Sequence, residues 1–160
     1  MARRHYPFVP KSTRSLTSGD FWAVPLLGGR YACGRVIQLA GDRLVSPMRA
    51  FFGGLHDWLD DAPPTSSDLA GQSMVAWGVM HIKAITETGG EILGNRSLEL
   101  DGIEPPLLLS AHGGRTATVL RGVTTLRVAR HDEWGSLPVL SYWSYDFIQQ
   151  LAESRLVRRR

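Results

Sequence analysis

The clearest hydrophobic pattern in the chain is a pair of short apolar runs on either side of a glycine turn. Residues 21–26 (FWAVPL) and 31–39 (YACGRVIQL) are rich in aromatic and β-branched side chains, as strands are. Gly28 and Gly29 lie between them and can adopt the positive φ angles of a tight turn. The pattern predicts a β-hairpin over residues 21–39, with Gly34 marking a bulge or a close approach of backbone to another group.

The middle of the chain gives a mixed pattern. The stretch MRAFFGGLHDWLDD spaces its large apolar residues at helical intervals but contains Gly53-Gly54, which predicts a short, broken helix. Residues 61–72 contain two prolines and several hydroxyl side chains, a composition typical of a loop. Residues 74–82 are apolar at both odd and even positions, which favours a central strand that is buried on both faces.

A helix is predicted late in the chain, over residues 145–156 (YDFIQQLAESRL), because its apolar residues recur on one side. Ser144 is its expected N-cap. Several short strands and one or two helices indicate an α+β domain built on an antiparallel, twisted or barrel-like sheet.

Charge divides the chain into acidic and basic parts. Residues 1–18 carry four basic and no acidic residues, and the last six residues carry four arginines. Residues 19–154 contain the ten remaining lysines and arginines and all 15 acidic residues. This part of the chain therefore has a net charge of −5, although the whole chain has a net charge of +3. We therefore expect a flexible basic arm over 1–18, a single domain over 19–156 and a basic tail over 157–160. Such ends are more often solvated than bound to nucleic acid.

The location expected from the sequence is the cytoplasm. Cys33 is the single cysteine, so no internal disulfide can form. The first 18 residues lack the apolar core of a secretory signal, and no apolar run approaches the length of a membrane span. We accordingly expect no membrane contact.

The chain contains no recognisable catalytic motif, and we expect neither enzyme activity nor a bound metal or cofactor. Cys33 lies inside a predicted strand and is expected to be a buried, inert thiol. His56, Asp57 and Asp60 have helical spacing and could hold a metal, although a solvated helix face is the simpler interpretation. The stretch HDEW (131–134) is either a polar loop or a general acid–base pair, and we favour the loop.

The acidic segment HDWLDDAPPTSSD, residues 56–68, is the predicted partner-binding site. Its carboxylates surround Trp58, which is expected to be exposed on a broken helix before a proline-rich loop and could anchor a contact. A solubilising loop without a partner is an equally good interpretation. The predicted binding residues are Asp57, Trp58, Asp60, Asp61 and Asp68.

The stretch GDFWAVPLLGGRYACGRV (residues 19–36) resembles the start of the bacterial immunity protein 26 family. In that family a Gly-Asp pair precedes an apolar strand ending in Pro-Leu, then a glycine turn and a Tyr-x-x-Gly-Arg-Val strand. The matching positions in this chain are Gly19, Asp20, Pro25, Leu26, Gly29, Tyr31, Gly34, Arg35 and Val36.

The resemblance implies a polymorphic-toxin immunity protein, which neutralises a cognate toxin by binding it and performs no chemistry itself. The acidic domain fits a basic toxin such as a nuclease through complementary charge. One alternative is a small β-barrel protein that binds nucleic acid through its basic termini, although nucleic acid is the less favoured partner. Another is a hydrolase that uses His131 and Asp132.

Overall fold

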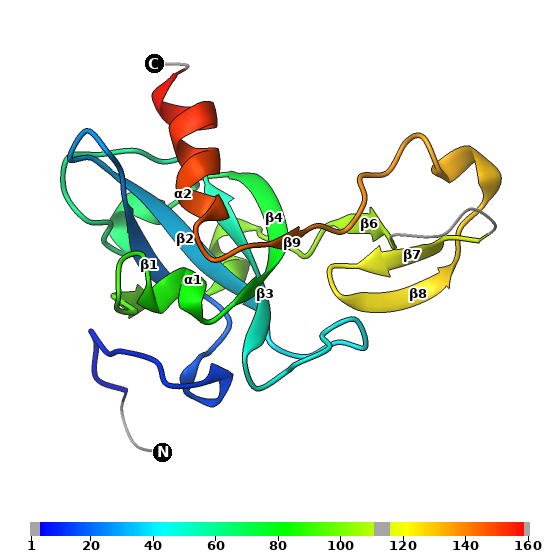
Figure 1. Ribbon diagram of the computed structural model, residues 1–160, viewed down its shortest axis with the longest axis horizontal. Coiled ribbons are helices and arrows are strands. Elements are labelled where there is room, and N and C mark those ends of the chain that lie inside the picture. Colours follow the sequence, from blue (N-terminus) through cyan, green and yellow to red (C-terminus); the bar gives the residue numbers. More distant parts are fainter. Residues whose placement is uncertain (1–3, 111–115, 159–160) are drawn as a thin grey trace.

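The fold described here comes from a computed structural model, which describes residues 4–110 and 116–158. Over these residues it is an α+β fold with nine strands and two short α-helices (Figure 1). The strands are β1 (Asp20–Pro25), β2 (Tyr31–Gln38), β3 (Ala50–His56), β4 (Met74–His81), β5 (Gly94–Asn95), β6 (Leu107–Leu109), β7 (Thr118–Arg121), β8 (Thr124–Val128) and β9 (Tyr142–Trp143). The helices are α1 (Lys83–Thr86) and α2 (Phe147–Ala152), and α2 continues as a π-helical turn over Glu153–Val157.

Six strands form the main sheet in the order β5-β1-β2-β3-β4-β9. All neighbouring pairs are antiparallel except β4 and β9, which run parallel. Strands β5 and β9 form its two edges, so the sheet is open and does not close into a barrel.

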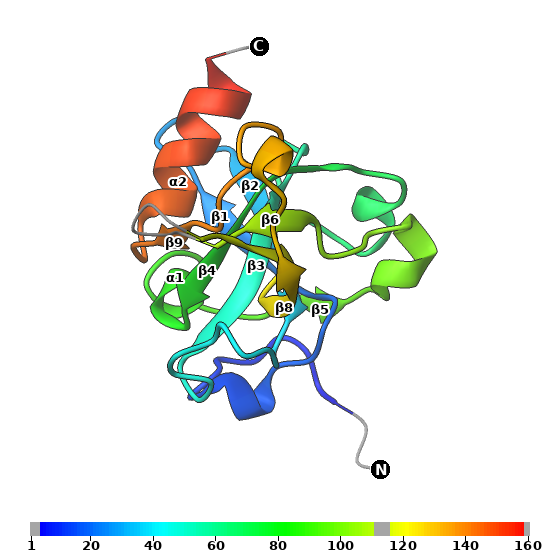
Figure 2. The same ribbon diagram turned by 90° about the vertical axis from the view of Figure 1, so that its right-hand side faces the viewer.

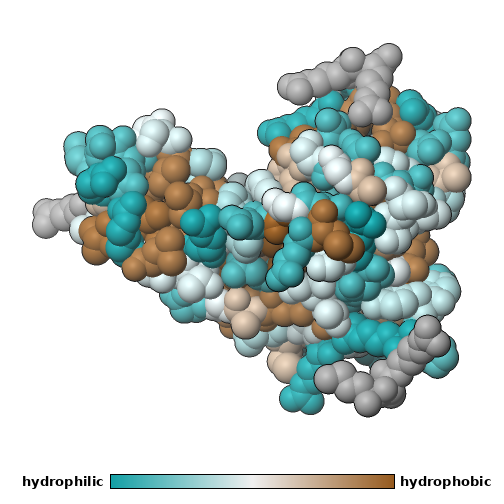
Figure 3. Space-filling view, turned by 180° about the vertical axis from the view of Figure 1, so that it is seen from behind, coloured by the Kyte–Doolittle hydropathy of each residue, from teal (hydrophilic) through white to brown (hydrophobic). Residues whose placement is uncertain are grey.

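The remaining strands form a second, antiparallel sheet in the order β6-β7-β8. Together with the turn at His131–Glu133 this sheet makes a lobe that projects from the main sheet (Figures 1 and 2). Apolar side chains are visible on the lobe in Figure 3. Its exposed large apolar residues are Leu107, Leu126 and Val128, and Val139 is exposed beside β6 on the segment that leads from the lobe to β9.

The main sheet is buried on both faces, because successive side chains of a strand point to opposite sides. One face carries Trp22 and Phe51, whose rings meet edge to face at 5.8 Å, and packs against α2. The other face carries Phe52, which packs against the lobe, and Cys33, which packs against the chain after β3.

The predicted hairpin and the predicted central strand are confirmed as β1–β2 and β4. Gly29 has φ +82°, as the turn requires, and Gly34 lies against the Trp22 ring, so the expected close approach is present. The late helix is confirmed in shorter form, but its N-cap is Asp146, and Ser144 Oγ instead donates to Asp146 Oδ1 at 3.0 Å.

The predicted broken helix at residues 51–59 is wrong. This stretch forms β3 up to His56, and it pairs with β2 on one side and β4 on the other. Gly53 and Gly54 weaken a helix, whereas in β3 they let neighbouring side chains and backbone pack closely over them.

The segment before Gly19, for which the sequence predicts a flexible basic arm, contacts the rest of the fold at several of its described residues. Phe8 forms a two-way backbone bridge with Ile92, at 3.1 and 2.8 Å, and Leu16 is buried in the core. Arg4 forms an ion pair with the buried Asp20 at 3.4 Å. Residues 159 and 160 of the predicted basic tail lie outside the described residues.

Candidate functional site

The predicted binding segment forms part of a closed loop between β3 and β4, residues 57–73, which we call the acidic loop. Its two ends are joined, because the Asp57 amide donates to the Ser73 carbonyl at 2.9 Å. A short 3-10 turn, Ser67–Leu69, lies inside it. Loops whose ends meet and whose own side chains pack beneath them are compact surface structures that frequently carry function.

Trp58 is buried, so the prediction that it is an exposed anchor is wrong. The side chain is 7% exposed and packs with Phe21 and Cys33 of the hairpin and with Leu69 of the loop itself. The neighbouring aspartates suggested exposure, but the indole turns away from them onto the sheet. Trp58 thus holds the acidic loop against the hairpin and is not available to a partner.

Asp60 and Asp61 are held outward on this loop. The backbone of Asp60 pairs with Tyr31 of β2 in both directions, at 3.1 and 2.8 Å. The Asp60 carboxylate accepts the Asp61 amide at 2.6 Å, and the Asp61 side chain is 88% exposed. Arg30 Nε lies 3.4 Å from Asp61, an exposed pair of the kind that contributes little to stability. Two carboxylates are therefore presented from a fixed backbone.

The other two predicted aspartates differ in their surroundings. Asp57 is exposed at the beginning of the loop. Asp68 is half-buried, and its Oδ2 accepts hydrogen bonds from the Thr65 amide and hydroxyl, both at 2.8 Å. Asp68 thereby fixes the turn before the 3-10 segment. The structure thus brings Asp57, Asp60 and Asp61 to the outside of one loop and gives Asp68 a local structural role.

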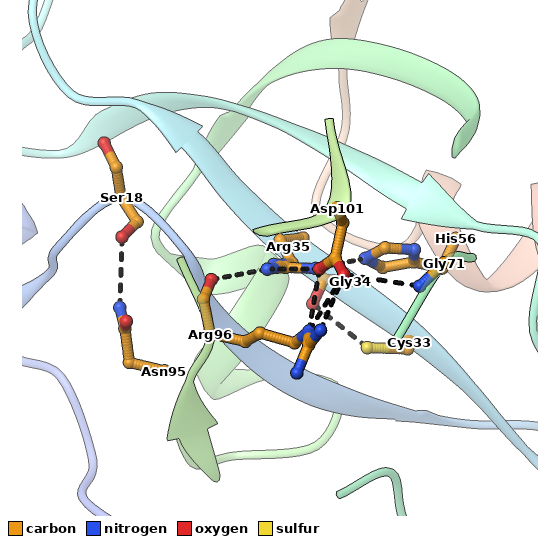
Figure 4. A network of polar contacts seen from close by, with 9 residues as sticks. All are labelled: Ser18, Cys33, Gly34, Arg35, His56, Gly71, Asn95, Arg96 and Asp101. Carbon is orange, nitrogen blue, oxygen red and sulfur yellow. Dashed lines mark hydrogen bonds and ion pairs between the residues drawn. The ribbon is translucent and has the colours of Figure 1, made fainter. Parts of the chain in front are cut away.

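A buried polar network lies at the base of the acidic loop (Figure 4). Arg35 of β2 is fully buried, and its Nη1 and Nη2 both donate to Asp101 Oδ2 at 3.3 Å. Arg35 Nη2 also donates to the Arg96 carbonyl. Arg96 binds the same carboxylate: its Nε donates to Oδ2 and its Nη2 donates to Oδ1, both at 2.8 Å. The Gly71 amide donates to Asp101 Oδ1 at 3.3 Å, which ties the acidic loop into the network.

His56, at the end of β3, completes the network. Its Nε2 lies 3.2 Å from Arg35 Nη1, and because a guanidinium can only donate, Nε2 must be the unprotonated acceptor. Burial, followed by the charge of Arg35, lowers the pKa of His56 to about 4. Hydrogen bonds from Arg96 are the main cause that lowers the pKa of Asp101 to about 2. The network therefore contains a neutral imidazole, a carboxylate and two guanidinium groups.

Sequence reasoning missed this network. Its signal was Arg35, a charged residue within a strand of otherwise apolar residues, which requires a buried partner. The interpretation of His56, Asp57 and Asp60 as one solvated helix face is wrong, because His56 is buried at the end of a strand while the two aspartates are exposed. Nothing local pointed to Asp101, which lies 66 residues from Arg35.

Gly19 and Asp20, two of the residues that carry the resemblance, have structural roles in this chain. Asp20 is fully buried and accepts hydrogen bonds from the Thr17 amide at 2.8 Å, the Tyr6 hydroxyl at 3.1 Å and Asn95 Nδ2 at 2.9 Å. Gly19 has φ +95° and lies where a Cβ would overlap the Arg96 carbonyl. These positions join the hairpin to the segments on either side of it.

The stretch HDEW forms a structural turn in the lobe. Glu133 is bound by Arg127 Nη1 and Nη2 at 2.6 and 2.8 Å and by the Arg130 amide at 2.9 Å. The His131 ring packs against Trp134 with centroids 5.0 Å apart, and Asp132 pairs with Arg130. This agrees with the interpretation of HDEW as a polar loop.

Cys33 is fully buried, and burial raises the pKa of its thiol. Its lack of reactivity stays a prediction. In residues 4–110 and 116–158 no three His, Cys, Asp or Glu side chains gather closely enough to hold a metal ion. Over the same residues, no helix has the length and apolar composition that a membrane span needs.

Comparisons with known proteins give no relative from which to transfer a function. No family model, no curated protein and no solved structure matches the chain.

Proposed function

We propose that this protein is a non-enzymatic immunity protein that binds and neutralises a cognate bacterial toxin, with a basic toxin domain such as a nuclease as its partner. The observation that carries the proposal is the acidic loop, which presents Asp60 and Asp61 from a backbone fixed at both ends. The resemblance of residues 19–36 to immunity protein 26 supplies the class of partner.

A fixed acidic loop suits this role for two physical reasons. Complementary charges steer a basic partner towards the surface and raise the association rate, an effect that salt weakens. A loop that is already ordered loses little conformational entropy when it binds, so more of the interaction energy appears as affinity. A toxin that acts inside the producing cell must be met there, which places the protein in the cytoplasm.

The proposal predicts that a neighbouring gene encodes a toxin domain, and the test uses that domain; neighbouring genes that encode no toxin would count against the proposal. Asp60→Asn and Asp61→Asn together remove two exposed charges, and we expect the association rate at low salt to fall on the order of tenfold. Stopped-flow fluorescence at several salt concentrations measures this, and the difference from wild type should shrink as salt rises.

A matched control removes the same charge elsewhere. Glu87 and Glu91 are exposed carboxylates near α1, and Glu87→Gln with Glu91→Gln should change the association rate much less. If the aspartate variant binds the toxin with unchanged association and dissociation rates while remaining folded, the acidic loop is not the interface. Retention of the wild type on DNA, lost when residues 155–160 are deleted, would favour nucleic-acid binding instead.

A further inference from the structure

The outer edge of β4 is only partly covered by β9. The pairing of the two strands joins Val79 to Tyr142 and Met80 to Trp143 and extends no further along β4 in the described chain. The Val79 amide donates to the Ser141 carbonyl at 2.8 Å, so Val79 directs its backbone groups towards β9. Alternate residues of a strand direct these groups to the same side. Trp77 therefore points its N–H and C=O along the same edge, beyond the end of β9.

A groove of about 330 Å³ lies along this open part of the edge, and we call it the edge groove. Its floor is the stretch Val75–Trp77 of β4. One wall comes from the C-terminal helix and the other from the lobe, and Figure 1 shows β4 between these two parts. The wall residues are Phe147, Leu151 and Arg155 on the helix side and Leu108, Pro138 and Val139 on the lobe side.

The two walls belong to opposite faces of the main sheet. Phe147 and Leu151 pack against the core on the Trp22 face, whereas Leu108 packs against the core that contains Phe52. A strand added beside β4 would thus find apolar surface on both of its sides. Strands that are buried on both faces consist of consecutive apolar residues, without the alternation of apolar and polar residues seen in half-exposed strands.

Among the described residues that line the edge groove, Arg155 alone is charged. It is exposed, its Nη1 donates to the Val75 carbonyl at 3.1 Å, and it forms no ion pair with any described residue. A guanidinium has further N–H donors in the same plane, and these match a carboxylate. This end of the groove favours an acidic side chain.

The recessed position of the edge argues against a second copy of the chain as the occupant. In a symmetric dimer each β4 would lie between its own helix and its own lobe. Paired strands lie about 5 Å apart, so the helix and the lobe of one copy would have to pass those of the other along the same edge. A single extended segment has no such obstacle.

We propose that an extended segment of the partner protein adds to β4 as a new strand in the edge groove. This segment contains about three consecutive apolar residues, to match the open length of β4, and a carboxylate that reaches Arg155. Backbone hydrogen bonds to Trp77 hold it, and the two apolar walls select its side chains. The identity of the partner as a toxin rests on the proposed function, whereas the chemistry of the segment does not.

The test uses a phage-displayed library of random linear peptides selected against the full-length protein. Selected peptides should share a run of apolar residues next to an acidic one. In hydrogen exchange, saturation with such a peptide should slow the Trp77 amide about tenfold or more. A library that yields no binding peptide, or peptides that leave this amide unchanged, would overturn the proposal.

Matched variants locate the binding of the selected peptide. Val139→Asp places a charge in the groove wall, and we expect the Kd of the peptide to rise about tenfold or more. Val128→Asp, at an exposed valine of the lobe outside the groove, should leave the Kd unchanged. Arg155→Glu should weaken the binding of an acidic peptide, and Arg158→Glu should weaken it much less. Equal effects within either pair would contradict the proposed site.

The outcome is separable from that of the proposed function. Peptide binding requires no toxin, so it can succeed even if Asp60→Asn and Asp61→Asn leave toxin binding unchanged. Conversely, toxin binding that depends on the acidic loop and is unaffected by Val139→Asp would support the proposed function and would exclude the edge groove as a toxin-binding site. A stable dimer in light scattering that Val139→Asp dissociates would make a second copy the occupant and overturn the proposal.

Discussion

Between pH 7 and pH 4 the protein should lose stability because His56 cannot take up a proton in the folded state. The ring is fully buried, and Arg35 Nη1 faces the nitrogen that would be protonated, at 3.2 Å. An unperturbed histidine has a pKa of 6.5. Burial, and after it the charge of Arg35, lowers the pKa of His56 to about 4. The unfolded chain thus binds more protons than the folded protein in this range, and protonation draws the protein towards the unfolded state.

The magnitude follows from the difference between the two pKa values. Each unit of difference corresponds to about 1.4 kcal/mol, so His56 can reduce the free energy of unfolding by about 3 kcal/mol. The reduction is absent above pH 6.5, grows as the pH falls, and is complete below pH 4. His56→Gln should flatten this dependence, because a glutamine oxygen can accept from Arg35 and does not titrate.

Urea unfolding followed by tryptophan fluorescence, at half-unit steps from pH 7.5 to 4.5, measures the effect. The informative quantity is the difference in unfolding free energy between wild type and His56→Gln, since groups common to both cancel. Among these are Asp101 and His81, whose pKa values are also lowered in the fold. The same substitution at exposed His131 controls for replacing a histidine as such. Parallel stability curves for wild type and His56→Gln would refute the reasoning.

Two further predictions concern packing. Trp58→Ala should lower the free energy of unfolding by about 3 to 5 kcal/mol because the indole is buried against the hairpin, and Trp58→Phe should lower it less. Urea unfolding measures both variants. An unfolding free energy of Trp58→Ala close to that of wild type would show that the ring is not part of the core. Gly34→Ala should cost about 1 to 3 kcal/mol because a Cβ there would overlap the buried Trp22 ring. Gly28→Ala is the matched control, since a Cβ at Gly28 meets nothing within 4 Å, and an equal melting temperature for the two variants would contradict this account.

Local signals were enough to predict the hairpin, the central strand and the late helix. The glycine turn at Gly28–Gly29 and the apolar strand at β4 are properties of a few neighbouring residues. The assignment of β3 failed because Phe51 and Leu55 have helical spacing, while pairing with both β2 and β4 decides the outcome. Such pairing is a tertiary effect that overrides local preference.

Only part of the candidate site was predicted, because local patterns indicate which residues are exposed but not which distant residues they contact. The carboxylates Asp57, Asp60 and Asp61 are exposed, as their polar neighbours in the sequence suggested. The position of Trp58 depends on the hairpin surface beneath it, which no local pattern reveals. The partner of Arg35 is Asp101, and a distant residue of this kind is found only when the fold brings it near.

The parallel pairing of β9 with β4 has a consequence for how the chain folds. Parallel neighbours cannot be joined by a tight turn, and here the whole stretch from His81 to Tyr142, including the lobe, connects them. The first four strands meet through shorter connections and can pair as soon as they leave the ribosome. Contacts that span a long stretch of chain form late, because the entropy of closing the loop is lost before the contact is gained. The C-terminal segment therefore completes the sheet last, and the helix side of the edge groove forms only after the first four strands have paired.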